Sequence, residues 1–427
     1  MSKPKKLSLI EAIFINTNIM LGTGTFVNTA MLAQTVGALG GFLYLGAGFL
    51  MLPLSFCFAR LANICPGGTF YAFGSSLGRY WGFISTWSYF FGKLASASLS
   101  IHVFITFLQR TIPALQIFPV IGLDCALISL FISLNLLDVK TGGKIQYLFL
   151  STKILPILFV IFSGLHYTNI INIQAPHLLW DGIPVALPLM LFCFLGFESS
   201  CSLSRVVEQP EKNIPRAIMI SFCLVLSFIF LYQTIFYLSM GSALAGAKSY
   251  VDIFPLLLSK VLPNSAELLA PLFSTTIGIA ALGGAYGILY SNPWNLYTLA
   301  EQKAIPKAAW FTQLNRHSIP YICVITEGIL CCAYILWLKG AQVPLQYTAT
   351  LSCIVTYTIS VLGLMKIQPS ILSFLGLITC MTALFFSIRG FLYTSTLPLL
   401  VLGLILLFGT INYFIIRSTQ LNSHKSN

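Results

Sequence analysis

The sequence predicts an all-α polytopic membrane protein with about twelve transmembrane helices. Of its 427 residues, 57% are hydrophobic and only 8% are charged, and the mean hydropathy is +0.88. A soluble domain carries about a quarter charged residues, so that class is excluded. Apolar runs of about 20 residues, the length that a helix needs to cross a ~30 Å hydrocarbon layer, recur along the whole chain. The weak ten-residue alternation typical of a membrane β-barrel is not seen.

Each expected span is an apolar run bounded by polar or turn-forming residues. The twelve runs cover 11–33, 37–62, 82–108, 117–137, 144–167, 184–204, 215–240, 266–299, 320–338, 344–365, 370–388 and 396–416. The run 266–299 is long enough to tilt or to extend beyond the bilayer. Two short polar tails, 1–10 and 417–427, flank the spans.

The distribution of Lys and Arg predicts the orientation in the membrane. With the N-terminus inside, the cytoplasmic segments hold 16 of these residues and the outer segments hold 5, which matches the positive-inside rule. The remaining two, Lys93 and Lys153, fall within spans. We therefore expect a multi-pass protein of the cell (inner or plasma) membrane, with the N- and C-terminal tails both cytoplasmic.

Several other classes of protein are disfavoured by the sequence. The cations that give the net charge of +12 lie mostly in the loops and tails that flank the spans, which favours a lipid bilayer and not nucleic acid as the partner. The eleven cysteines form no CxxC pair or Cys/His cluster, so neither a metal site nor another cofactor is expected. No HExxH or paired-aspartate signature suggests an intramembrane enzyme, and no filter-like repeat suggests a channel.

Two spans contain glycines near their middles. The first reads Gly22-Thr23-Gly24-Thr25 and the sixth reads Leu195-Gly196-Phe197. They stand at the same ordinal position if 11–167 and 184–365 are two five-helix repeats, followed by two peripheral helices at 370–416. Because five is odd, the second repeat would be inverted. Matching interruptions of this kind indicate the binding site of a secondary transporter, although glycine also serves close helix packing.

Four segments in order carry a family resemblance. They are Gly22-Thr23-Gly24-Thr25-Phe26, then Cys65-Pro66-Gly67-Gly68-Thr69-Phe70-Tyr71, then Phe194-Leu195-Gly196-Phe197-Glu198, and Glu208-Gln209-Pro210-Glu211-Lys212-Asn213-Ile214-Pro215-Arg216-Ala217. They resemble motifs of the amino acid–polyamine–organocation transporters. The resemblance implies the inverted five-plus-five repeat of the leucine-transporter-type fold, with helices 1 and 6 broken.

The chain departs from the family pattern after the eighth span. The family loop usually reads Ala-x-Asp-Gly-x-x-Pro, whereas this chain has Ala300-Glu301-Gln302-Lys303-Ala304-Ile305-Pro306. Pro293-Trp294 also stands where a small or basic residue is usual. These departures leave the structure of the cytoplasmic gate and the subfamily of the chain undecided, but they do not affect the expected fold.

Helix breaks suit an amino acid because they offer partners for both of its charges without charged side chains. The second half of span 1 would begin near Gly24 and direct free N–H groups at a carboxylate, with the hydroxyls of Thr23 and Thr25 as further donors. The first half of span 6 would end near Gly196 and direct free carbonyls at an ammonium. Gly22 completes the first break.

Aromatic side chains are expected around the two breaks. Phe192, Phe194 and Phe197 flank Gly196, and the third span contributes Trp87 and Tyr89. By resemblance, Phe192 and Tyr89 match positions where family members place aromatic groups over the substrate. The alternative is that 34 phenylalanines in an apolar chain place some beside any glycine.

Three ionisable residues lie deep inside spans, where such groups are costly and usually functional. By resemblance, Glu198 belongs to a gating or proton-linked network, and Lys153 matches a fifth-span lysine that replaces sodium in proton-coupled members. Lys93 would pair with Glu198 or meet an anionic substrate. Glu11, Asp124 and Glu327 lie closer to span ends, where contact with the interface is expected.

The sequence thus predicts a secondary active transporter of amino acids that works by alternating access, driven by protons or by exchange. A sodium-coupled transporter, a polyamine transporter and a channel stay open as alternatives. The identity of the amino acid and the oligomeric state do not follow from the sequence.

Overall fold

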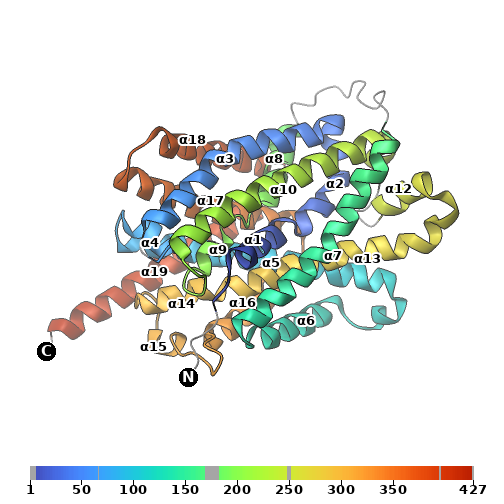
Figure 1. Cartoon of the computed structure of the whole chain (residues 1–427). Helices are drawn as coiled ribbons and strands as arrows, with labels where there is room; N and C mark the ends of the chain where they lie inside the picture. The colour runs from blue at the N-terminus through green and yellow to red at the C-terminus, as the bar shows by residue number, and fades with distance from the viewer. Residues whose placement is uncertain (1–5, 66, 169–181, 248–251, 394–395, 426–427) are drawn as a thin grey trace.

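The computed structural model describes residues 6–65, 67–168, 182–247, 252–393 and 396–425, and their regular structure is helical (Figure 1). Within these residues the only extended pairing is an isolated parallel bridge between Leu7 and Val207. The all-α prediction is confirmed for this part of the chain. Residues 1–5 of the expected N-terminal tail and Pro66 of the second motif lie outside it.

The described residues contain nineteen α-helices, named in chain order. They are α1 (Leu9–Met20), α2 (Thr23–Val36), α3 (Gly40–Ile64), α4 (Phe70–Ser75), α5 (Arg79–Thr111), α6 (Val120–Asn135), α7 (Val139–His166), α8 (Ile183–Phe194), α9 (Ser199–Ser202), α10 (Pro210–Met240), α11 (Ser242–Ala245), α12 (Ile253–Val261), α13 (Ala266–Ser291), α14 (Pro293–Glu301), α15 (Ala308–Phe311), α16 (Tyr321–Leu338), α17 (Gln342–Ile367), α18 (Ile371–Tyr393) and α19 (Leu397–Lys425).

Nine segments of the described residues are long and apolar enough to cross a membrane. One of them, Leu9–Ile64, contains the three successive helices α1, α2 and α3. Two further apolar helices, α6 and α8, have 16 and 12 residues and fall below the length of a full span. These findings establish a polytopic membrane protein, and the number twelve stays a prediction.

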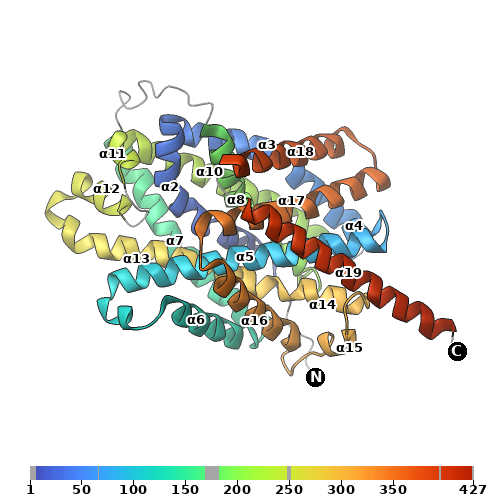
Figure 2. The same cartoon turned by 180° about the vertical axis from the view of Figure 1, so that it is seen from behind.

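Helices α5 and α17 form the centre of the bundle (Figure 2). Helix α5 packs against α17, α13, α16 and α4, while α3 packs along α10. The outer helices present apolar side chains outward: Leu148, Leu155 and Phe162 follow one another at seven-residue intervals on α7 and are exposed. The same helix buries Gln146 and Lys153. This distribution is the one expected when the outside is hydrocarbon and the inside holds the polar groups.

The helix interruptions expected at the glycines are present. Helix α1 ends at Met20 and α2 begins at Thr23, with Gly22 as its N-cap. Helix α8 ends at Phe194, and α9 begins at Ser199. Between them Gly196 has a φ of +130°, a backbone conformation that side chains disfavour.

The long eighth segment consists of two helices. Helix α13 ends at Ser291, and Pro293 opens α14, a position where the missing N–H of proline has no consequence. In the loop that follows, Lys303 has a φ of +52° and Lys307 a φ of +51°. Lys303 stands where the family pattern has glycine, so the turn keeps a left-handed residue at a cost of about 1 kcal/mol for a side chain.

Candidate functional site

The two helix breaks lie against each other in the middle of the bundle. A Cβ at Gly24, in the first turn of α2, would lie 2.8 Å from Cδ1 of Phe192 at the end of α8. A Cβ at Gly196 would lie 2.6 Å from Cγ2 of Ile19 at the end of α1. The interrupted segments, distant in sequence, are therefore in direct contact, and glycine is what permits the approach.

Opposite ends of two helices meet at this contact. The first turn of α2 has N–H groups without intrahelical partners at Thr23, Gly24 and Thr25, and the last turn of α8 has carbonyls without them. An anion is favoured at the first end and a cation at the second. The Thr23 hydroxyl donates to Oγ of Ser100 at 2.5 Å. The Thr25 hydroxyl is buried and has no hydrogen-bond partner among the described residues.

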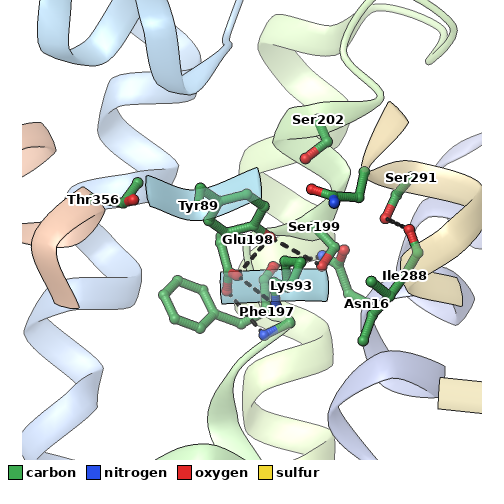
Figure 3. A network of polar contacts seen from close by, with 12 residues as sticks. Asn16, Tyr89, Lys93, Phe197, Glu198, Ser199, Ser202, Ile288, Ser291 and Thr356 are labelled. Carbon is green, nitrogen blue, oxygen red and sulfur yellow. Dashed lines mark hydrogen bonds and ion pairs between the residues drawn. The ribbon is translucent and has the colours of Figure 1, made fainter. Parts of the chain in front are cut away.

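Glu198 is the centre of a buried polar network beside the second break (Figure 3). Its Oε1 accepts a hydrogen bond from the Tyr89 hydroxyl at 2.7 Å and lies 3.1 Å from Nζ of Lys93. Its Oε2 accepts from the Gly196 N–H at 3.0 Å. The pairing of Lys93 with Glu198, one of two alternatives left open by the sequence, is thus the observed one.

The expected aromatic residues do not all lie at the helix breaks. Phe192 faces Gly24 at the break. Tyr89, besides its bond to Glu198, stacks on Phe70 with ring centroids 4.0 Å apart. Phe197 packs edge-on against Phe58 of α3 and Phe222 of α10. Trp87 donates its indole N–H to the Ile405 carbonyl of α19 at 3.0 Å and so faces the peripheral helix instead of the breaks.

Asn16 joins the two broken segments and was missed by the sequence reasoning. Its amide donates to the Phe197 carbonyl at 2.7 Å, and its Oδ1 accepts from the Ser200 N–H at 2.8 Å. It thereby satisfies backbone groups that the break of span 6 leaves free. The signal that could have identified it is an amide residue within an apolar span.

Lys153 of α7 reaches the first break from the other side. Its ammonium is buried and donates to the carbonyls of Asn18 and Leu21 at 2.8 and 2.9 Å, and to that of Ala280 on α13 at 3.1 Å. The carbonyl end of α1 carries partial negative charge, so it favours a cation there. Gln146, two turns earlier on α7, accepts from the Asn18 side chain. Lys153 therefore connects α7, the broken first span and α13.

Glu327 differs from the expectation that it contacts the interface, because α16 packs it against α14 and α5, where it is fully buried. Its Oε1 accepts from the Asn292 amide at 2.9 Å. Asn295 donates to Asn292 and to Ser202 of α9, both at 3.0 Å. This relay of amides between α13 and α14 was also not foreseen.

Asp124 and Glu11 are the other two acidic residues expected near span ends, and their environments differ. Asp124 is fully buried, and its Oδ2 lies 2.8 Å from Nδ1 of His102. Glu11 agrees with the expectation, since it is partly exposed and pairs with Lys140 at 2.8 Å. In the described part of the chain, no three His, Cys, Asp or Glu side chains are grouped as ligands of a metal ion.

Comparison with known proteins places the chain among permeases. It is 26% identical over 321 residues to the D-serine/D-alanine/glycine transporter of Escherichia coli (strain K12), which covers 70% of this chain and 66% of that protein. It is 28% identical over 355 residues to the amino-acid permease RocE of Bacillus subtilis (strain 168), covering 78% and 73%. It is 23% identical over 404 residues to the vacuolar cationic amino acid transporter 4 of Arabidopsis thaliana, covering 86% and 64%.

The chain thus spans about two thirds of the length of two of these relatives. The family model described as amino acid permease matches residues 7–416, nearly the whole sequence. The chain belongs to the amino acid permease family.

Proposed function

We propose that this protein carries amino acids across the membrane by alternating access, as a secondary active transporter. Family membership supports the substrate class. The observation that carries the proposal is the contact between the two helix breaks at Gly24 and Phe192, where free N–H groups and free carbonyls converge. A free amino acid is the small molecule whose two charges match those two helix ends.

The proposed architecture has twelve spans, an inverted five-plus-five repeat and both termini in the cytoplasm. Helix contacts support the repeat because they occur in corresponding pairs. Helix α5 packs on α17, and its proposed counterpart α13 packs on α7; likewise α5 contacts α16, and α13 contacts α6. The pair α3 and α10, which would be related to each other, pack side by side. The bias of Lys and Arg supports the orientation.

In the proposed complex the carboxylate of the substrate accepts hydrogen bonds from the first N–H groups of α2. The Thr25 hydroxyl, buried and without a partner, supplies one more donor, and Gly22 and Gly24 allow the backbone to approach. The ammonium faces the last carbonyls of α8 before Gly196, and Phe192 covers the side chain. Tyr89, which donates to Glu198, and Phe197, which directly precedes Glu198 in the chain, are proposed to close the site.

A neutral amino acid is the substrate that the buried charges favour. Lys93 and Glu198 neutralise each other at 3.1 Å, so neither is free to receive a charged side chain. One relative is named as a transporter of D-serine, D-alanine and glycine, which are neutral, and another as a cationic amino acid transporter. The pairing favours the first substrate class, and it disfavours a polyamine.

Coupling to protons or exchange is proposed over coupling to sodium. The Lys153 ammonium occupies the point where carbonyls of α1 and α13 converge, and a sodium ion there would have to displace it. A lysine that loses its proton when the carbonyls move apart would load and release one proton in each cycle. Glu198 is proposed to act in gating.

The test is uptake by the purified protein in lipid vesicles. We expect saturable uptake and counterflow of a labelled neutral amino acid, with unlabelled neutral amino acids competing more strongly than arginine, glutamate or putrescine. Flux that does not saturate and shows no counterflow would identify a channel. Competition dominated by putrescine would show that the substrate is a polyamine and not an amino acid. Uptake that requires sodium would contradict the proposed coupling to protons or exchange.

A further inference from the structure

Three cations converge at one end of the bundle. Arg79 begins α5, Lys303 follows α14, and Arg417 lies in the last turns of α19; all three are exposed and line one recess together with Tyr71 and other residues. Arg79 is the first residue of the candidate span Arg79–Thr111, Lys303 follows the span Pro263–Glu301 by two residues, and Arg417 lies three residues before the end of the span Leu397–Gln420. The recess is therefore at the level of the membrane surface.

These cations have no acidic partner among the described residues. No ion pair with a carboxylate involves Arg79, Lys303 or Arg417 in the described part of the chain. Glu301, the nearest carboxylate along the chain, is paired with Arg205. Three uncompensated positive charges around one recess repel one another, so an anion bound between them would be stabilised by all three.

An apolar groove continues from the recess. It has a volume of about 660 Å³ and is lined by residues of α14, α15 and α19 and of the loop between α14 and α15. The three helices lie near one another at one end of the bundle (Figure 2). Its walls include Ile305, Ala308, Ala309 and Ile415. Lys303, Ile416 and Gln420 line both the recess and the groove, and Gln420 donates to the Lys303 carbonyl at 3.0 Å. The positively charged recess and the apolar groove thus share one wall.

Two lysines at this groove adopt a conformation that side chains disfavour. Lys303 and Lys307 have φ values of +52° and +51°, and both line the groove. The Lys307 ammonium lies 4.6 Å from the ring centroid of Trp310, an exposed aromatic residue of the kind that marks membrane interfaces. Strain of this kind is most often retained where the side chain has a use.

We propose that the recess and the groove together bind one anionic phospholipid. Its phosphate would accept hydrogen bonds from Arg79, Lys303 and Arg417, and one acyl chain would lie between α15 and α19. A headgroup with net negative charge is favoured by the uncompensated cations, and the acyl chain is favoured because it covers apolar wall that would otherwise stay open. The bound lipid would connect α19 to the loop after α14.

The experiment measures lipid retained by the purified full-length protein, by native mass spectrometry, after equilibration with micelles containing equal amounts of phosphatidylglycerol and phosphatidylcholine with the same acyl chains. We expect about tenfold preference for phosphatidylglycerol in the wild type. The triple variant Arg79→Gln, Lys303→Gln, Arg417→Gln should retain both lipids equally. A matched control, Lys212→Gln, Arg216→Gln, Lys366→Gln, removes three exposed cations outside the groove and should keep the wild-type preference.

Three outcomes would overturn the proposal: preference kept by the triple variant, preference lost equally in the control, or full competition by soluble glycerol 3-phosphate, which would indicate a site for free phosphate. Ala309→Trp fills the groove without changing charge and should reduce retention of the lipid while leaving binding of glycerol 3-phosphate unchanged. If the triple variant does not fold, Arg417→Gln alone on the exposed face of α19 should lower the preference about threefold, and an unchanged preference would contradict the proposal. The assay needs no transported substrate, so its result is independent of the proposed transport function.

Discussion

The ammonium of Lys93 lies 3.1 Å from Oε1 of Glu198, and both side chains are buried in the centre of the bundle. Lys93 comes from α5, the central helix, and Glu198 from the break between α8 and α9. The ion pair therefore connects one of the two central helices to a segment with irregular backbone. Each of the two buried charges has the other as its counter-ion.

Removing one member of this pair should destabilise the protein more than removing both. Lys93→Met leaves a buried carboxylate without its cation, a change that costs about 3–5 kcal/mol in buried pairs. Adding Glu198→Gln removes the unpaired charge and should recover much of that loss. The measurement is the thermal unfolding temperature in detergent, with the exposed Lys212→Met as control. Equal destabilisation by the single and the double variant would show that the pair is not energetically coupled.

Glu198→Gln alone should reduce turnover more than equilibrium affinity. Its carboxylate holds Tyr89 and the Gly196 N–H instead of facing the first N–H groups of α2. We expect transport to fall by about tenfold or more while the binding constant for substrate changes by less than about threefold. Exposed Glu211→Gln on α10 is the matched control. A large loss of affinity with turnover intact would indicate direct recognition of the substrate by Glu198.

Gly24→Ala should weaken substrate binding without unfolding the protein. The added Cβ would lie 2.8 Å from the Phe192 ring, which must move into the space proposed for the substrate. An affinity loss of about tenfold, or ~1.4 kcal/mol, is expected in an equilibrium binding assay. Gly46→Ala is the control, because nothing lies within 4 Å of a Cβ there. Wild-type affinity in a folded Gly24→Ala protein would place the site elsewhere.

Lys153→Gln should uncouple transport from the proton gradient. Glutamine still reaches the carbonyls of the first break but carries no charge. Uptake by the wild type should rise when an inward proton gradient is imposed, whereas the variant should show counterflow without that rise. Lys144→Gln, an exposed position on the same helix, should respond as the wild type does. A gradient response that persists in Lys153→Gln would assign Lys153 a structural role only.

The sequence by itself determined the class of the fold and the places where its helices break. Apolar runs predict spans because the hydrocarbon layer imposes one length and one kind of surface on every helix. Gly22 and Gly196 could be recognised because glycine in corresponding spans is a local signal, and the interruptions at Leu21–Gly22 and at 195–198 agree with it. The family resemblance rested on short segments, and it too could be read without coordinates.

Only the tertiary structure decided which groups meet. The choice of Glu198 as the partner of Lys93, the contact of Asn16 with the backbone at Phe197, and the burial of Glu327 depend on how helices are rotated about their axes. Hydropathy gives little information on that rotation in a membrane helix, where apolar residues cover every face. Side-chain packing between helices sets it instead, through contacts between segments far apart in the chain. The groove beside α19 arises for the same reason, since its walls come from two separate segments that only the packed bundle brings together.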